Sequence, residues 1–270
     1  MVGGQQIAGF EVFGWSVSGN ETCIGVKQKS AFFLFDVGIV PSWAKAAEHP
    51  LSHGHIDHIG GICQHMRKRE LNRMPPAKYY LLPALIESVK ALCAEYGKMQ
   101  SSSMLQCFQE PLLVPVESGS TIQINNQWSV RSFATDHAVP SQGYILYSTD
   151  DDLKQTVPVV AFTGDTRFSI FTHLAHPDLL KVKLLIAEAT YLDRPDKHLP
   201  SAQLHGHIHL QQYAQNADLF HTIGALYLMH FSDRYSVRQI TDLINTTFRE
   251  DLSRKTYLCL AAKRAQNMDC

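Results

Sequence analysis

Short apolar runs alternate with turn-forming Gly, Ser and Asn residues in the first part of the chain. Ile7 to Phe13, Thr22 to Val26 and Ala31 to Val37 each have the length and composition of a strand. Beyond them, the pattern predicts one or two helical turns over 41–48 and a helix over 59–73. The chain is therefore predicted to open with a strand meander.

The rest of the chain continues as strands with helices between them. The predicted strands are 79–82, 112–116, 121–124, 128–133, 143–147, 157–162, 184–187 and 225–229. The predicted helices are 83–97, 168–175, 209–220 and 237–248, and 99–110 is predicted to be a loop. Because no repeat or linker interrupts this order, we predict an α/β (α+β) fold with a single domain over residues 1–270.

A short segment after the third apolar run concentrates ionisable side chains. It contains His53, His55, Asp57 and His58. Neutral imidazole and carboxylate are ligands that zinc prefers, and without a metal such a group would be half-desolvated and unpaired. A solvated polar loop is the alternative. We interpret the segment as part of a metal site.

Three more candidate ligands each follow a predicted strand. His137 comes after 128–133, Asp165 after 157–162 and His230 after 225–229. A single histidine in such a place is more often a structural residue, but several equivalent positions favour convergence on one site. We expect these residues to complete the metal site.

Composition narrows the functional class. A chain of 270 residues that is 45% hydrophobic can bury a sizeable core. No segment approaches the roughly 18 apolar residues of a membrane span, and residues 1–14 do not resemble a secretory leader, so we expect a soluble intracellular protein. The compartment is not indicated. A net charge of −1 provides no global attraction for a polyanion such as RNA.

The six cysteines are scattered and form no C-x-x-C pair. They are Cys23, Cys63, Cys93, Cys107, Cys259 and Cys270. This spacing argues against a thiolate zinc site and against a disulfide scaffold. We expect most of them to be buried free thiols.

Four motifs resemble a known family. His53-x-His55-x-Asp57-His58 resembles the signature of the metallo-β-lactamase-fold hydrolases. The ribonuclease Z branch is indicated by Phe162-Thr163-Gly164-Asp165-Thr166, by Ala187-Glu188-Ala189-Thr190 with Gly206-His207, and by His230-Phe231-Ser232-Asp233-Arg234-Tyr235. The resemblance implies a four-layer αββα sandwich.

The resemblance also implies two metal ions. His53, His55 and His137 would hold one, Asp57, His58 and His230 the other, and Asp165 would bridge them. The mainly imidazole set favours two Zn²⁺, although Mn²⁺ or Fe²⁺ would also accept it. Two such cations can share a hydroxide for hydrolysis, and Asp57 would help to orient it.

Glu188 and His207 are implied to act together as a general acid. Hydrolysis of a phosphodiester needs a proton for the leaving oxygen, and a histidine held by a carboxylate can supply it. Ala187 and Ile208-His209 depart from the family, which has His and Ser-Thr there. The alternative is a structural carboxylate beside a polar helix start.

Substrate contacts are less determined. Ser232 and Arg234 could bind phosphate, although Arg234 could equally pair with a carboxylate. A dense basic patch just beyond the metal segment could follow a nucleic-acid backbone, but a solvated helix face is the preferred interpretation. The patch consists of Arg67, Lys68, Arg69, Arg73 and Lys78.

Two departures concern the substrate. Ribonuclease Z enzymes carry a tRNA-binding arm, commonly between the motifs of His137 and Asp165, and the polar turn predicted over 148–155 leaves no room for one. The segment Asp36-Val37-Gly38-Ile39 also replaces the usual Asp-x-Gly-Glu-Gly. We therefore predict a dinuclear phosphodiesterase that acts on RNA 3′ ends or on a smaller phosphodiester, and family analogy suggests a homodimer. The alternatives are a thioester or lactone hydrolase and a non-catalytic, metal-stabilised binding protein.

Overall fold

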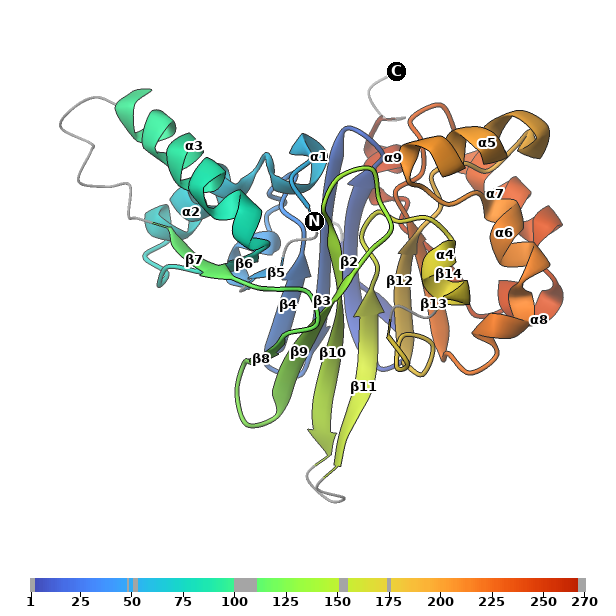
Figure 1. Ribbon diagram of the computed structural model, residues 1–270, viewed down its shortest axis with the longest axis horizontal. Coiled ribbons are helices and arrows are strands. Elements are labelled where there is room, and N and C mark those ends of the chain that lie inside the picture. Colours follow the sequence, from blue (N-terminus) through green and yellow to red (C-terminus); the bar gives the residue numbers. More distant parts are fainter. Residues whose placement is uncertain are drawn as a thin grey trace.

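The strands of the protein form three sheets in a computed structural model (Figure 1). The structure describes residues 3–47, 49–50, 53–99, 111–150, 155–173 and 176–266. One antiparallel sheet has the order β1 (Gln5–Ile7), β2 (Phe10–Val17), β3 (Glu21–Gln28), β4 (Ala31–Phe35). A small parallel sheet contains β5 (His49–Pro50), β6 (Lys78–Leu81) and β7 (Leu112–Pro115).

The largest sheet has seven strands in the order β14-β13-β12-β11-β10-β9-β8. Its antiparallel half contains β8 (Thr121–Gln123), β9 (Trp128–Ala134), β10 (Gln142–Asp150) and β11 (Gln155–Phe162). Its parallel half continues from β11 through β12 (Leu184–Glu188), β13 (Ala225–Met229) and β14 (Thr256–Leu258). The carboxyl ends of β11, β12 and β13 therefore meet at one edge.

Helices lie on the outer sides of the two large sheets (Figure 1). On one side are α1 (Ile56–Ile59), α2 (Ile62–Leu71) and α3 (Ile86–Met99), with the short 3₁₀ helices η1 (Ala44–Ala46) and η2 (Pro83–Leu85). The other helices are α4 (Ser169–Thr172), α5 (Pro195–His205), α6 (Leu210–Gln215), η4 (Ala217–Phe220), α7 (Val237–Thr247), α8 (Glu250–Ser253) and α9 (Ala261–Gln266).

Strand alternation separates the core into layers. In β13, Leu226 and Leu228 pack in the cluster that joins the seven-stranded sheet to helices α4, α6, α7 and α8, whereas Tyr227 and Met229 face the four-stranded sheet. A third cluster joins β4 to α2 and α3. Both faces of each large sheet are thus covered, and the predicted four-layer αββα fold is confirmed.

Several predicted elements have different boundaries. The strand predicted over 7–13 is two strands, because Ala8 and Gly9 adopt φ values of 49° and 86° and reverse the chain. The helix predicted over 59–73 begins earlier and is divided into α1 and α2 at Gly60 and Gly61. The polar turn predicted over 148–155 is too long at both ends, because β10 continues to Asp150 and β11 starts at Gln155. Residues 151–154 lie outside the described residues.

Other differences lie in the second half of the chain. The helix predicted over 209–220 is α6 followed by η4, and that over 168–175 is the shorter α4, with 174 and 175 outside the described residues. From residue 100 on, the loop predicted over 99–110 is likewise outside them. The sequence analysis missed β5, α5, α8, β14 and α9. In α5, Pro195 and Pro200 obscure the helical pattern.

Candidate metal centre

The seven predicted metal ligands come together at one end of the two large sheets. Ligand atoms of His53, His55, His137 and Asp165 lie within 4.8 Å of one another, and so do those of Asp57, His58 and His230. The local cause is simple. His137, Asp165 and His230 each follow the end of a strand, β9, β11 or β13, while Asp57 and His58 lie in α1.

Asp165 is in contact with both groups. Its Oδ2 lies 3.3 Å from His58 Nε2, 3.4 Å from His230 Nε2 and 3.8 Å from His53 Nε2. Its Oδ1 is buried and has no hydrogen-bond partner among the described residues. A buried carboxylate oxygen without a partner is costly, and a cation would remove that cost.

The histidine nitrogens also face one another. His58 Nε2 lies 3.3 Å from His230 Nε2, and His55 Nδ1 lies 3.0 Å from His53 Nε2. Burial lowers the pKa of His53 to about 2, so this ring is neutral. Clustered imidazole nitrogens around carboxylates are the donor set of divalent transition metals, and the residues present fit such a group.

Outer hydrogen bonds set the orientation of the rings. His58 Nδ1 donates to Asp36 Oδ2 at 2.6 Å, and His137 Nδ1 donates to the carbonyl of Gly206 at 2.8 Å. His230 Nδ1 donates to Thr190 Oγ1 at 2.9 Å. Each bond leaves Nε2 directed at the cluster, as partners of metal-bound histidines usually do.

The sequence analysis missed Asp36 and Thr190. Asp36 follows β4 directly, as the candidate ligands follow their strands, and this position was the available signal. It is fully buried and adopts a φ of 60°, which is uncommon outside glycine. Nearby, a Cβ on Gly38 would lie only 1.7 Å from the Asp57 carbonyl oxygen. Only glycine therefore fits at this position of the family motif.

Glu188 and His207 form a hydrogen-bonded pair beside the cluster. His207 Nδ1 donates to Glu188 Oε1 at 2.9 Å and lies 3.9 Å from Asp165 Oδ2. Burial alone would lower the pKa of His207, but the Glu188 carboxylate outweighs it and raises the pKa to about 9. Glu188 also accepts from the Thr166 and Ile208 backbone amides.

His207 lies between two helices. The first is α5, which ends at His205 and has Gly206 as its C-cap with a φ of 79°, and the second is α6, whose N-cap is His209. The His209 side chain accepts from the Gln211 amide, so this histidine has the structural role foreseen in the alternative interpretation. His207, in contrast, stacks on His230 with 5.5 Å between the ring centres.

Ser232 and Arg234 form one unit at the edge of the site. Arg234 donates through Nε to Ser232 Oγ at 3.1 Å and through Nη1 to His198 Nε2 at 3.1 Å. Its guanidinium lies over the Tyr191 ring, 5.4 Å from the centroid. No ion pair found among the described residues includes Arg234, so its predicted alternative pairing with a carboxylate is not observed there.

The basic patch is not a solvated face. Arg69 is buried and donates to the carbonyls of Lys45 and Pro75, and half-buried Lys68 donates to that of Val40. Arg67 pairs with Glu70 at 2.8 Å. Lys68 and Arg69 thus pack α2 against neighbouring backbone, so the preferred interpretation was wrong for these two, whereas Arg67 pairs within the helix. Arg73 and Lys78 are exposed.

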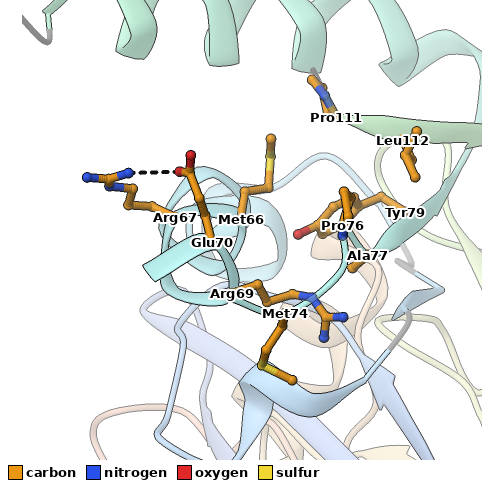
Figure 2. Close-up of a pocket in the computed structure, with 10 residues that line it drawn as sticks. All are labelled: Met66, Arg67, Arg69, Glu70, Met74, Pro76, Ala77, Tyr79, Pro111 and Leu112. Carbon is orange, nitrogen blue, oxygen red and sulfur yellow. Dashed lines mark hydrogen bonds and ion pairs between the residues drawn. The ribbon is translucent and has the colours of Figure 1, made fainter. Parts of the chain in front are cut away.

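A pocket beside α2 is separate from the metal cluster. Figure 2 shows that it lies between α2 and β7, and its lining includes Met66, Met74, Tyr79 and Leu112. Its volume is about 30 Å³, which suits one water-sized molecule. None of the predicted site residues lines it. This pocket is therefore too small to hold a substrate.

Comparisons with known proteins agree with the geometry. No protein-family model matches the chain. The chain is 32% identical over 265 residues to the tRNase Z TRZ1 of Arabidopsis thaliana, covering 89% of this chain and 91% of that protein. In the described part of the chain, no helix has the length and apolar character needed to cross a membrane.

Two solved structures share the fold. Human tRNase Z, short form, superposes with a TM-score of 0.63 at 17% identity, covering 92% of this chain and 95% of that chain. The metallo-β-lactamase fold protein YhfI from Bacillus subtilis gives a TM-score of 0.61 at 17% identity, with the same coverage. Together with the extended sequence identity to the Arabidopsis enzyme, the fold and the histidine and aspartate cluster lead to one conclusion: this chain belongs to the tRNase Z family of metal-dependent hydrolases.

Proposed function

We propose that the chain is an endonuclease that hydrolyses a phosphodiester at the 3′ end of an RNA, with precursor tRNA as the first substrate to test. The observation that carries the proposal is the Glu188–His207 pair, in which His207 Nδ1 lies 3.9 Å from the Asp165 oxygen that is near both His53 and His58. A proton donor at this place serves an alkoxide leaving group, which a smaller phosphodiester could also provide.

The metal ligands follow from the same cluster. We infer that His53, His55 and His137 hold one Zn²⁺ and that Asp57, His58 and His230 hold the other, with Asp165 between them. When bound, the two ions would activate water and neutralise charge on the phosphodiester. The Asp57 carboxylate, whose Oδ2 accepts from the Gly19 amide at 2.9 Å, would orient that water.

The general acid depends on Glu188. Because this carboxylate is fully buried and hydrogen-bonded, it keeps the His207 ring in place and protonated at neutral pH. The second nitrogen of the ring is then the proton donor to the leaving oxygen. A thiolate leaves readily without a proton, so a thioesterase would not need this pair.

Arg234 and Ser232 would bind a non-bridging phosphate oxygen of the substrate. The guanidinium is already oriented by Ser232, His198 and the Tyr191 ring, so its ordering would cost little entropy on binding. Arg234 forms no ion pair among the described residues, so its positive charge is available to bind an anion.

The test compares two leaving groups. Zinc-loaded wild type and His207→Asn are assayed on a precursor tRNA with a 3′ trailer and on bis(p-nitrophenyl) phosphate. We expect the variant to lose roughly 10²- to 10⁴-fold on the RNA and less than about 10-fold on the aryl ester, whose leaving group needs no proton. His205→Asn, two residues away in the exposed end of α5, is the matched control.

The outcome separates the candidate functions. Equal losses on both substrates would contradict the general-acid role. Cleavage of the aryl ester alone by wild type would favour a smaller phosphodiester, and hydrolysis of thioesters or lactones instead would favour the alternative hydrolase. If Asp57→Ala and His58→Ala retain full activity on every ester, the metal assignment is refuted.

We also infer that residues 1–270 form one domain, because both halves of the chain contribute ligands to the same cluster. A homodimer stays a prediction, for which sedimentation velocity is the direct measurement.

A further inference from the structure

Two buried cysteines face each other away from the metal cluster. Cys63 lies in the first turn of α2 and Cys93 lies in the middle of α3. Their sulfur atoms are 3.1 Å apart, and the residues are 5% and 3% exposed. A disulfide bond measures 2.03–2.05 Å, so a side-chain movement of about 1 Å would be enough to form one.

One side chain, Met66, contacts both the sulfur pair and a pocket that a small molecule can occupy. Met66 Sδ is 3.9 Å from Cys93 Sγ, and Met66 also lines the pocket of about 30 Å³ between α2 and β7 (Figure 2). A cavity of this volume holds a molecule near the size of water, such as hydrogen peroxide. It excludes a bulky oxidant such as glutathione disulfide.

The two thiols are not equivalent. The two sulfur atoms share a hydrogen bond, and this bond lowers the pKa of Cys93. The same contact raises the pKa of Cys63. Because Cys93 Sγ contacts Met66, which lines the pocket, Cys93 is assigned as the attacking residue and Cys63 as the resolving one.

We propose that Cys63 and Cys93 are a modification site, at which hydrogen peroxide produces a disulfide that links α2 to α3. The Cys93 sulfur attacks one peroxide oxygen, the O–O bond breaks, and hydroxide leaves with the thiol proton as water. The Cys63 sulfur then attacks the sulfenic acid of Cys93, the S–O bond breaks, and a second water leaves with the Cys63 proton. The two sulfurs lose two electrons, which the two peroxide oxygens gain.

The disulfide would stabilise the packing of α2 against α3, next to the segment that contains His53 to His58. It closes the loop from Cys63 to Cys93, and α2 starts at Ile62, only four residues after the predicted ligand His58. Restricting a loop of this length in the unfolded chain raises the melting temperature of a protein of this size by roughly 5–10 °C.

The test uses the full-length, zinc-loaded protein. It is treated with equimolar hydrogen peroxide, quenched with catalase, alkylated and digested without reduction. We expect a linked peptide that contains Cys63 and Cys93 and is lighter by two hydrogens. The Tm should rise by roughly 5–10 °C and return to its starting value with dithiothreitol.

Variants distinguish this pair from other thiols. Cys63→Ser should leave a sulfenic acid on Cys93, which dimedone traps once the oxidised protein is unfolded, with no rise in Tm. Cys23→Ser, at a buried cysteine outside the pair, should still form the bond. Because the peptide map is made on wild type, it stays decisive even if a variant misfolds. Linkage to Cys107 or Cys270, sulfinic acid on Cys93, or an unchanged Tm in linked protein would overturn the proposal.

Discussion

Replacement of Asp36 by asparagine tests whether a carboxylate outside the ligand set controls metal affinity. Asp36 is fully buried and accepts a 2.6 Å hydrogen bond from His58 Nδ1. A hydrogen bond to a charged group contributes about 1.5–3 kcal/mol, and asparagine keeps an acceptor there while removing the charge. We therefore expect Asp36→Asn to weaken zinc binding by roughly 10- to 100-fold, or about 1.4–2.7 kcal/mol.

The assay is a zinc competition titration against a chromophoric chelator at neutral pH. Circular dichroism of the metal-free variant checks that it is folded. Asp178→Asn is the matched control, because Asp178 accepts hydrogen bonds from Tyr147 and Lys181 and from no predicted ligand. If folded Asp36→Asn binds zinc as tightly as wild type, the carboxylate does not act through His58 and the reasoning fails.

Three further predictions follow from the same structure. Gly206→Ala should lower zinc affinity and phosphodiesterase activity by at least about 10-fold, because its Cβ would lie 2.7 Å from His137 Nδ1; Gly119→Ala, with a similar φ but open space, should cost only about 1 kcal/mol of stability. Burial lowers the pKa of His65 to about 4. Between about pH 6.5 and 4 the unfolded state therefore binds more protons than the folded state, and the stability of the folded state decreases as the pH is lowered. When the pH is lowered from 7 to 5, the free energy of unfolding measured with urea should decrease by about 2 kcal/mol less in His65→Gln than in wild type. His221→Gln is the control and should decrease as much as wild type. Removal of metal by a chelator should abolish hydrolysis and lower the Tm, because it leaves the clustered carboxylates uncompensated, and zinc should restore both; an unchanged Tm would refute this account of the cluster.

Much of the candidate metal centre could be predicted from sequence because the predicted ligands obey a local rule. A strand is recognised from four to eight residues, and the first few residues after it lie at the edge of the sheet. His137, Asp165 and His230 follow this rule. Boundaries were harder, since the break between α1 and α2 depends on how the segment packs rather than on its hydrophobic pattern.

The partners of these residues could not be predicted in the same way. Asp36 meets His58 across 22 residues, and Thr190 meets His230 across 40. The basic side chain of Arg69 similarly proved to be buried against carbonyl groups of two loops. Charge alone gives no sign of such a partner, because a buried polar group is stable only where folding brings a complementary one within hydrogen-bond distance.

The sequence by itself thus determined the kinds of chemistry present, the strands that carry the ligands and the family resemblance. The tertiary structure alone decided which carboxylate orients which ring, where His207 lies relative to its helices, and that Cys63 faces Cys93. The physical reason is the distance along the chain over which each kind of interaction acts. Strand and ligand preferences depend on neighbours in the chain, whereas desolvation and hydrogen bonding depend on groups that only packing brings together.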